Sequence, residues 1–494
     1  MAKPSKGLAT AGVLLFTYLA HLRTPWFRHL ASNLKTRGVT CNEKGLASIV
    51  VFAALSSLWK SQMVSLAKYL VFGKKLKFAG MADGELGFLD SVRAELLRLA
   101  ALAMGKFSTP IYPPTTLPTW HLSSPPTLPA KTMQSILQGL DTKKVQWASL
   151  PNKLRAVYLR DCIKNLIAVS EDLAAAAAAC KGGYEAGIAE ERLVAVGAVK
   201  TMREFAEVLE GGAPKVHFYK RESGQWVANT FPACWWENVF FSGWRGEVWV
   251  EPGKGPTQSR LSPGADKAGI TCVLGAGNQY NLTIEDIVTE MFTHNKVVIC
   301  KINPVLGFLQ PFLQQIFEPL ISLGYLAILD GGVAEGQYLC NSDFVSRVHM
   351  TGSAATWDAI VWQGKPKVGK PPFPKFCGGE LGGVTPFMVV PGNWSRLEMQ
   401  YQAKNIVSGL VFNASHNCLA AQVLVTARHW PQRAQFLNAV RAEMRKARPR
   451  ASFYPGTKEK YDRFFAEYPQ AEGVSPKGEE GTYPWVLAVG VPAE

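Results

Sequence analysis

The sequence lacks paired cysteines, clustered histidines and any C-x-x-C motif. It has nine cysteines, an odd number spread along the chain, and eight equally scattered histidines. The cysteines are residues 41, 162, 180, 234, 272, 300, 340, 377 and 418. This usage argues against a disulfide framework and against a metal site such as zinc, and it predicts reduced thiols in an intracellular compartment.

Acidic residues are nearly absent from the first 77 positions. This stretch has twelve Lys or Arg residues and one acid, Glu43, so it accounts for +11 of the net charge of +15. The other residues are almost balanced, with forty-one basic and thirty-seven acidic groups. A nucleic-acid-binding domain would have a basic stripe on a folded surface, whereas this excess lies in an N-terminal extension, so we predict no nucleic-acid partner.

No uncharged apolar run in this extension has the length of a membrane-spanning helix. Residues 46–59 are uncharged, and the apolar character continues past two lysines to Phe72. A spanning helix needs about 20 apolar residues. Four interpretations of residues 1–77 stay open: a helix on a membrane surface, an organelle-targeting presequence that is removed, a true span, or an extra helix packed on the domain. The predicted location is organellar or membrane-associated.

Proline excludes regular structure in the next part of the chain. Residues 89–104 have an amphipathic helical pattern, but seven prolines follow between Pro110 and Pro129. Proline cannot continue a helix or a central strand. We therefore predict a helix and a semi-extended linker over residues 78–131.

The remaining sequence has helical and strand patterns in alternation. Residues 152–181 and 185–209 predict a helical hairpin, and residues 215–252 predict strands with a turn at 222–224. From Gly269 short apolar strands alternate with helices. The expected strands are 270–274, 297–302 and 345–350, and the expected helices are 284–292, 309–323 and 354–361. This order indicates an α/β fold with a Rossmann-type parallel sheet.

Two short patterns carry candidate chemistry. The first, G-G-E-L-G-G-V-T-P at residues 378–386, predicts Glu380 in a glycine-flanked turn; the second, residues 413–425, predicts Cys418 in a loop entering a helix. A thiol nucleophile and a carboxylate that activates water are the groups that a covalent thioester mechanism needs. Alone, a cysteine in an apolar neighbourhood is more often an inert core residue than a nucleophile, and a glutamate near glycines usually lies in a surface turn. His416 does not pair with Cys418 in a protease-like dyad, because residues two apart share a face only on a strand.

Together the two patterns resemble the aldehyde dehydrogenase superfamily, whose E-L-G-G glutamate and N-x-G-Q-x-C cysteine stand about this far apart. The resemblance implies that Cys418 attacks an aldehyde and that Glu380 activates water for thioester hydrolysis. It implies that Asn278 holds the oxyanion, although Asn278 could instead cap the following helix. It also implies a Rossmann-type cofactor domain (residues 132–385, including the helical hairpin and an arm used in oligomerisation) and an α/β catalytic domain (386–494).

The same resemblance implies an NAD or NADP site. Lys301 stands at the family's ribose-binding lysine, Gly352 and Ser353 stand at the phosphate-binding helix start, and Leu381 and Gly382 are also expected to bind the cofactor. The glycine fingerprint that begins at Gly275 has Tyr280 where its third glycine belongs. The family's G-S-x-x-x-G has a tryptophan, Trp357, at its last position, and Pro304 replaces an acid that would exclude NADP.

The chain resembles an atypical branch with L-G-A-G-N, K-x-N-P-V and Y-P-G-x-x-x-x-Y segments, at residues 274–278, 301–305 and 454–461. The family's C-terminal E-x-F-x-P segment has no counterpart, so the catalytic domain is expected to be incomplete. Two alternatives therefore stay open beside the aldehyde-oxidising enzyme. One is an acyl-CoA-linked dehydrogenase, which Glu380 disfavours, and the other is a non-catalytic, membrane-associated protein that keeps the fold.

Overall fold

The computed structural model describes residues 127–183, 187–212, 216–257, 264, 267–475, 478 and 481–491. The chain divides into two units, residues 1–112 and 113–494, and every described residue belongs to the second. The predictions for residues 1–77, for the helix at 89–104 and for most of the linker lie outside the described residues. Among the described residues, no helix could cross a membrane and no cluster of His, Cys, Asp and Glu could hold a metal ion.

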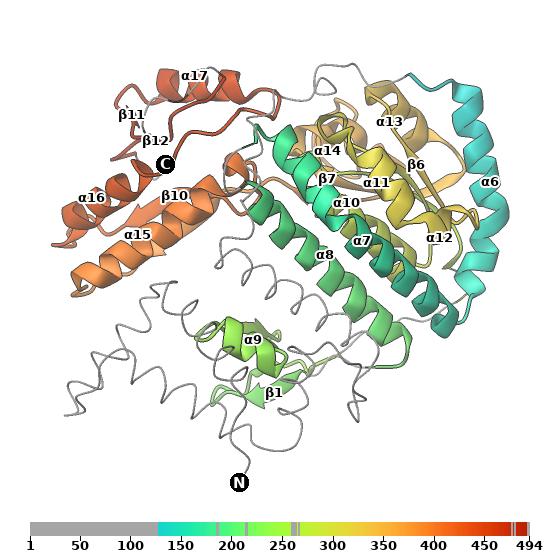
Figure 1. Cartoon of the computed structure of the whole chain (residues 1–494), viewed down its shortest axis with the longest axis horizontal. Helices are drawn as coiled ribbons and strands as arrows, with labels where there is room; N and C mark the ends of the chain where they lie inside the picture. Colours follow the sequence, from blue (N-terminus) through green and yellow to red (C-terminus); the bar gives the residue numbers. More distant parts are fainter. Residues whose placement is uncertain are drawn as a thin grey trace, which may run out of the picture. The chain divides into compact units, whose positions relative to one another are not determined.

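A parallel sheet of five strands organises residues 270–381, in the order β6-β5-β4-β7-β8. Figure 1 labels two of its strands, β6 and β7. The strands are β4 (Ile270–Leu274), β5 (Val297–Lys301), β6 (Leu326–Leu329), β7 (Val345–Gly352) and β8 (Phe376–Leu381). All four pairings are parallel, and β5 is buried at every position. An unbroken apolar run such as Val297–Cys300 is typical of a strand covered on both faces. The predicted α/β fold class is confirmed.

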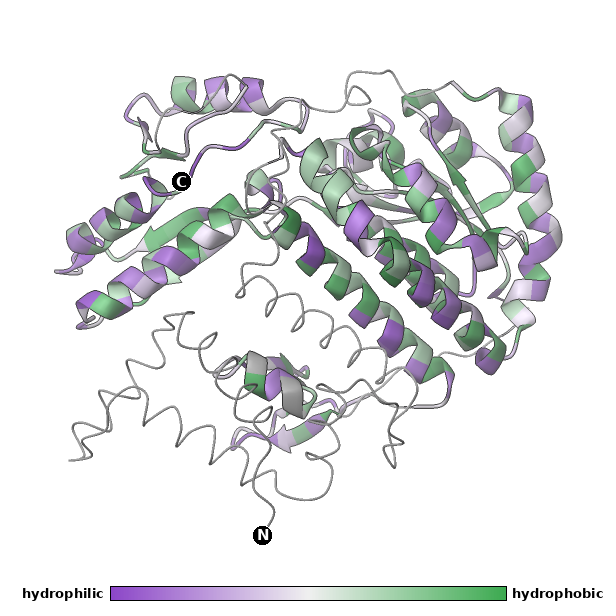
Figure 2. Ribbon diagram, in the orientation of Figure 1, coloured by the Kyte–Doolittle hydropathy of each residue, from purple (hydrophilic) through white to green (hydrophobic). Residues whose placement is uncertain are grey.

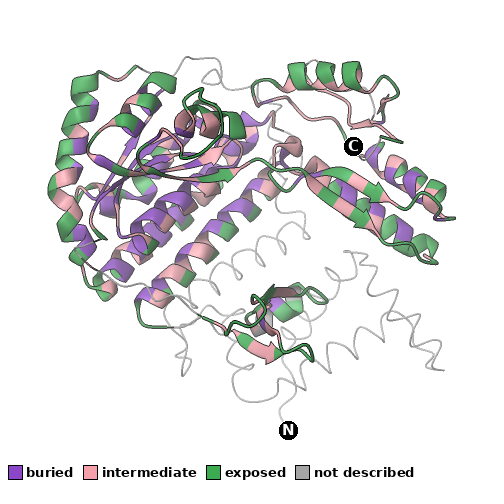
Figure 3. Ribbon diagram, turned by 180° about the vertical axis from the view of Figure 1, so that it is seen from behind, coloured by how far each residue is buried: buried purple, intermediate pink, exposed green. Residues whose placement is uncertain are grey.

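Helices pack on this sheet, either directly or through other helices. The helices are α6 (Ala130–Ser149), α7 (Asn152–Cys180), α8 (Gly187–Leu209), α10 (Tyr280–Val288), α11 (Leu309–Ile316), α12 (Glu318–Ile321), α13 (Val333–Asn341) and α14 (Ala354–Val361). The hairpin of α7 and α8 lies against α11 and α10, and α10 contacts β4 and β7. The hydrophobic residues gather in the sheet and along the inner sides of α7 and α8 (Figure 2), which are also the buried parts (Figure 3).

Three details of this region differ from the sequence patterns. The helix expected at 284–292 begins earlier, at Tyr280, and continues after Val288 as the π-helix η3 (Thr289–Thr293). The single helix expected at 309–323 is broken into α11 and α12 at Phe317. The patterns predict neither β6 nor α13. In the case of β6, a strand of four residues is too short to show a period.

The arm is a small antiparallel sheet with one short helix. Its strands β1 (His217–Lys220), β2 (Trp226–Phe231) and β3 (Gly246–Trp249) pair in the order β1-β2-β3. The predicted hairpin joins β1 and β2, where Gly224 N donates to Arg221 O at 2.9 Å. The helix α9 (Trp235–Phe240) interrupts the strand pattern between β2 and β3.

The C-terminal region has its own small core. The strands β9 (Thr385–Val389) and β10 (Ala421–Thr426) form a parallel pair, which packs with α15 (Arg396–Val411) and α16 (Arg433–Met444). The helix α17 (Thr457–Glu467) has no buried residue, and β11 (Glu472–Gly473) pairs with β12 (Val486–Leu487). The helix expected after Cys418 is wrong: that segment is β10, since alternating valines at 423 and 425 suit a strand that pairs with β9.

Candidate active site

Cys418 follows a strained loop, residues 412–418, that we call the thiol loop. It begins with the 3-10 helix η5 (Phe412–Ser415), in which Asn413, Ala414 and Ser415 have φ of 53°, 53° and 66°. The left-handed region costs an ordinary L-residue roughly 1–2 kcal/mol. Three consecutive non-glycine residues in it need support from their surroundings, and such strain is concentrated at functional sites.

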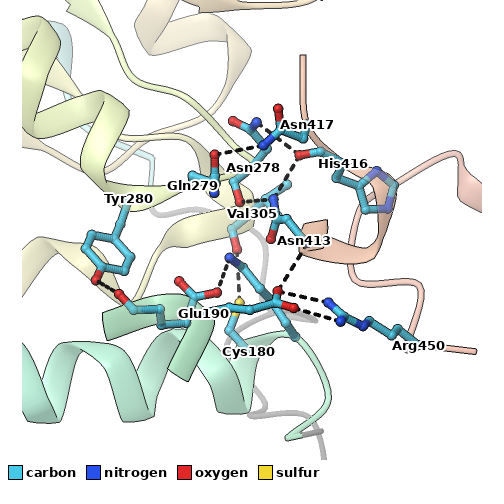
Figure 4. Close-up of polar contacts among 12 residues, drawn as sticks. Cys180, Glu190, Asn278, Gln279, Tyr280, Val305, Asn413, His416, Asn417 and Arg450 are labelled. Atoms are coloured by element: carbon cyan, nitrogen blue, oxygen red, sulfur yellow. Dashed lines mark hydrogen bonds and ion pairs between the residues drawn. The ribbon is translucent and has the colours of Figure 1, made fainter. Parts of the chain in front are cut away.

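Asn413 and Asn278 meet at one carbonyl oxygen of the thiol loop. The Asn413 side chain is buried, and its Nδ2 donates to Asn278 O at 3.0 Å and to His416 O at 2.8 Å (Figure 4). The Asn278 Nδ2 donates to the same His416 O at 3.0 Å. An amide nitrogen has two hydrogens, so Asn278 keeps one N–H for another acceptor. Residues 138 positions apart in the sequence are therefore held together at the thiol loop.

The Cys418 thiol is exposed. Its Sγ lies 3.8 Å from Asn417 Oδ1, which also accepts a hydrogen bond from Leu419 N at 2.8 Å. The Cys418 carbonyl accepts from Thr385 Oγ1 at 3.4 Å, at the start of β9. The thiol can therefore be reached by a substrate while its backbone is held between β9 and the thiol loop.

Glu380 lies in β8 and not in the expected turn. The strand forms because residues 376–381 pair in register with β7, which places Thr351 opposite Glu380 and Gly352 opposite Leu381. Glu380 is exposed. The pairing brings the predicted carboxylate beside the predicted phosphate-binding segment, and Gly382, also exposed, follows directly after the strand.

The predicted phosphate-binding segment lies where β7 ends and α14 begins. Ser353 caps α14, and its hydroxyl accepts a hydrogen bond from Thr356 N at 3.1 Å. Residues 353–356 are exposed, so the first turn of α14 offers backbone N–H groups, which favour phosphate. Trp357 lies against β8: a Cβ on Gly379 would be 2.7 Å from its Cδ1. Only glycine fits at position 379 beside this indole.

Lys301 ends β5 and is 8% exposed. Its Nζ donates to Ile302 O at 3.1 Å and to Gly331 O at 2.8 Å. Burial lowers the pKa of this ammonium, and neighbouring groups such as Asp330 oppose that shift. Since an ammonium has three donors, Lys301 has one left for a ribose hydroxyl.

Tyr280, which replaces the third fingerprint glycine, joins two helices. Its hydroxyl, at the start of α10, donates to Glu191 O in α8 at 2.5 Å, and burial raises its pKa. The glycine before Asn278 has a separate role: a Cβ on Gly277 would lie 2.7 Å from Asn303 Nδ2 and 2.8 Å from Tyr454 Oη. The three segments of the atypical branch therefore meet at Gly277.

A polar network under the end of β7 has no sequence signal. Arg347, His349 and Thr351 lie on one face of β7, and they contact Asp286 of α10 and Glu290 of η3. Arg347 Nε donates to Glu290 Oε2 at 2.8 Å, and Thr351 Oγ1 donates to Asp286 Oδ2 at 2.8 Å. Burial alone would lower the pKa of His349, but the hydrogen bond and charge of Asp286 outweigh it and raise that pKa. The network fixes the strand that carries Gly352.

These residues fit one end of a dinucleotide. The exposed first turn of α14, preceded by Gly352 and Ser353, suits a pyrophosphate, and the free donor of Lys301 suits a ribose. The residue after Asn303 is Pro304, which begins the 3-10 helix η4 (Pro304–Leu306). No carboxylate stands at that position to repel a 2′-phosphate.

Comparisons with known proteins identify similar folds and one matching family model. The model of the "Aldehyde dehydrogenase family" matches residues 280–458. A succinate-semialdehyde dehydrogenase from Burkholderia pseudomallei is 15% identical, with 74% of this chain and 70% of that chain covered and a TM-score of 0.53. An NAD-dependent benzaldehyde dehydrogenase from Corynebacterium glutamicum is 13% identical, with 73% and 70% covered and a TM-score of 0.52.

Two further comparisons show how much of each chain is matched. The glyceraldehyde-3-phosphate dehydrogenase GapN from Methanocaldococcus jannaschii, complexed with NADP, is 14% identical over 73% of this chain and 72% of that chain, with a TM-score of 0.51. The chain spans about half, 54%, of aldehyde dehydrogenase C from Pseudomonas syringae. A search of curated proteins finds no match. Residues 280–458 therefore match the aldehyde dehydrogenase family, and the chain shares the fold of these solved aldehyde dehydrogenases.

Proposed function

We propose that this protein oxidises an aldehyde to a carboxylic acid through a thioester on Cys418, with NAD or NADP as cofactor. The observation that carries the proposal is the shared His416 carbonyl, which holds the Asn278 amide at the thiol loop. An oxyanion needs such fixed N–H donors in place before the reaction begins. The exposed Cys418 thiol follows this shared carbonyl by two residues, and an exposed thiol on the loop that holds such a donor is suited to attack on a carbonyl carbon.

The roles of the chain's own residues follow from their positions. The Cys418 thiolate would attack the aldehyde carbon, and the remaining N–H of Asn278 and the Cys418 backbone N–H would hold the oxyanion. When bound, the cofactor would supply the hydride acceptor, and Gly352, Ser353, Lys301, Leu381 and Gly382 would hold it. Exposed Glu380 would then activate water for hydrolysis of the thioester.

Both cofactors are compatible with the residues at the adenine-side ribose. Pro304 has no charge to oppose the 2′-phosphate of NADP, so we expect at most a modest preference between NAD and NADP. A comparison of the two dissociation constants tests this. A preference for NAD on the order of a thousandfold, about 4 kcal/mol, would contradict it.

The full-length protein and its Glu380→Gln variant test the proposal together. The wild-type protein should form NADH or NADPH with at least one member of a panel of short, long and aromatic aldehydes. Glu380→Gln should give a burst of up to one reduced cofactor per site and then a slow phase, because only thioester hydrolysis is impaired. Neither burst nor turnover from the wild-type protein would contradict the proposal.

A coenzyme A arm of the same assay tests the nearest alternative. If Glu380 activates water, added coenzyme A should leave the steady rate of the wild-type protein unchanged. Turnover that requires coenzyme A, with an acyl-CoA product and no free acid, would assign the chain to acyl transfer instead of hydrolysis.

A further inference from the structure

The thiol loop cannot keep its shape by local preference alone. Of its three left-handed residues, only Asn413 is of a type that enters this region readily, whereas Ala414 and Ser415 have no such tendency. Such backbone persists only where contacts from elsewhere in the fold determine it. The contacts that reach the start of the loop are therefore the ones that can control the site.

One of these contacts comes from the first turn of α8. Glu190 Oε2 accepts a hydrogen bond from Asn413 N at 3.2 Å, across 223 residues of sequence. Arg450 holds the same carboxylate with two hydrogen bonds, from Nη1 to Oε2 at 2.9 Å and from Nη2 to Oε1 at 2.7 Å (Figure 4). The Arg450 and Glu190 side chains are 12% and 19% exposed. A bidentate pair of this kind fixes direction as well as distance.

The residue after Glu190 anchors this turn to the cofactor domain. Glu191 forms an ion pair of 2.5 Å with Lys181, and both side chains are 2% exposed. Its carbonyl accepts the Tyr280 hydroxyl. Glu190 therefore extends from a fixed point toward the thiol loop.

From Asn413 the contacts continue to the reacting groups. Its backbone is held by Glu190, and its side chain donates to His416 O, the oxygen that also orients Asn278. We propose that Glu190 and Arg450 are positioning residues, which hold the thiol loop in its left-handed conformation and so keep the Asn278 amide bound to the loop that carries Cys418. The inference deepens the proposed function, and it rests on that function only for its kinetic consequence.

Hydrogen exchange of the full-length chain tests the positioning role of Glu190 without the need for an activity assay. In Glu190→Ala the segment 412–418 should exchange about tenfold faster than in the wild-type protein, as expected when one hydrogen bond to a charged group is lost. The strand β5, residues 297–301, should exchange as before. Glu190→Gln, which keeps an oxygen acceptor, should give a smaller increase.

Arg441→Gln is the matched control. Arg441 pairs with Glu472 at 2.6 Å in the same C-terminal region, and this pair has no contact with the thiol loop in the described structure. Arg450→Gln should speed exchange at 412–418, whereas Arg441→Gln should not. Equal effects of the two arginine variants on this segment would overturn the proposal.

A charge reversal distinguishes the effect of the Glu190–Arg450 ion pair from the effect of the Glu190 contact with Asn413. The double variant Glu190→Arg with Arg450→Glu restores a pair of opposite charges but removes the carboxylate from Asn413 N. It should therefore recover part of the lost thermal stability and leave 412–418 unprotected. Full recovery of protection at 412–418 would show that the carboxylate does not position the loop.

Kinetics distinguish a failed inference from a failed function. If the protein oxidises aldehydes, Glu190→Ala should lower kcat at least tenfold and leave the cofactor dissociation constant unchanged, because Ser353 and Lys301 are not disturbed. An unchanged kcat with faster exchange at 412–418 would overturn the positioning of Asn278. A wild-type protein without turnover would contradict the proposed function. The hydrogen-exchange measurements on residues 412–418 would still show whether Glu190 and Arg450 hold the loop.

Discussion

The two parallel sheets of this protein are covered to different extents. The five-stranded sheet is packed by helices, and the strands β4 and β5 are buried almost throughout. Within the described part of the chain, the pair β9–β10 packs one face on α15 and α16, with Phe387, Val389 and Leu424 turned inward. On the other face Met388 is 77% exposed and Val425 is 47% exposed. Parallel sheets covered on one face only are uncommon.

This difference in coverage suggests that the large sheet mainly stabilises the fold, whereas the β9–β10 region carries the reacting thiol. The five-stranded sheet has a continuous apolar core and carries the predicted cofactor residues at the ends of its strands. The thiol stands before β10, in the thinly covered region, and is held by polar contacts to the first region. We therefore expect substitutions in the large sheet to change the free energy of unfolding and substitutions at the thiol loop to change activity.

The largest effect should come from Cys418→Ala. Loss of the nucleophile should lower turnover by at least about a thousandfold. The melting temperature should stay the same, because the thiol is exposed and fills no core. A coupled NAD(P)H assay and thermal unfolding measure the two quantities. Cys377→Ala, in β8, serves as the control that keeps turnover, and residual activity of Cys418→Ala near the wild-type level would remove Cys418 from the mechanism.

The opposite pattern is expected for Ile299→Ala. Ile299 is fully buried in the middle of β5, so this change should lower the free energy of unfolding by about 2–5 kcal/mol through lost burial and a cavity. Val425→Ala, on the open face of β10, should cost less than about 1 kcal/mol. Urea unfolding compares the two. Equal costs would mean that the open face of β9–β10 is covered in solution.

The edge of the large sheet next to Glu380 should be sensitive to a single methyl group. Gly379→Ala would place a Cβ 2.7 Å from Trp357 Cδ1, and overpacking of this kind costs about 1–3 kcal/mol. Trp357→Ala should relieve much of that cost in the double variant. Gly382→Ala is the control, because nothing lies within 4 Å of its added Cβ. Additive costs of the two changes would contradict a contact between them.

The stability contributed by a histidine in each region should also change with pH in opposite directions. Burial, with the positive charges of Lys460 and Lys181, lowers the pKa of His416 to about 4. The unfolded chain binds a proton near pH 6.5, so the stability that His416 contributes is lost as pH falls from about 6.5 toward 4. The pKa of His349 is raised, so its contribution is full below about pH 6.5 and is lost as pH rises through the folded pKa.

Urea unfolding of His416→Gln and His349→Gln at pH 7.5 and pH 5 measures this contrast. The cost of His416→Gln should be smaller at pH 5 than at pH 7.5, by up to about 2 kcal/mol. The cost of His349→Gln should be larger at pH 5. A change of the same sign in both variants would contradict the opposite environments assigned to the two rings.

The sequence by itself determined the fold class and several of the helices, among them α7, α8 and α14, because apolar period and strand–helix alternation are local properties of the chain. The strand Ile270–Leu274 and the helix Ala354–Val361 have the expected bounds. The short patterns around Glu380 and Cys418 were enough to indicate the aldehyde dehydrogenase family. Their local structure was predicted wrongly. The strand β8 forms by pairing with β7 and the strand β10 by pairing with β9, and a window of a few residues does not contain both strands of a pair.

The tertiary structure alone decided how the candidate site is held. Nothing in the sequence near Cys418 points to Glu190, to Arg450 or to the network below β7, because these contacts join residues between 57 and 260 positions apart. The meeting of Gly277, Asn303 and Tyr454 is equally non-local. A left-handed run such as 413–415 opposes the preference of its own residues, and only contacts made after folding, such as that of Glu190 with Asn413, can stabilise it.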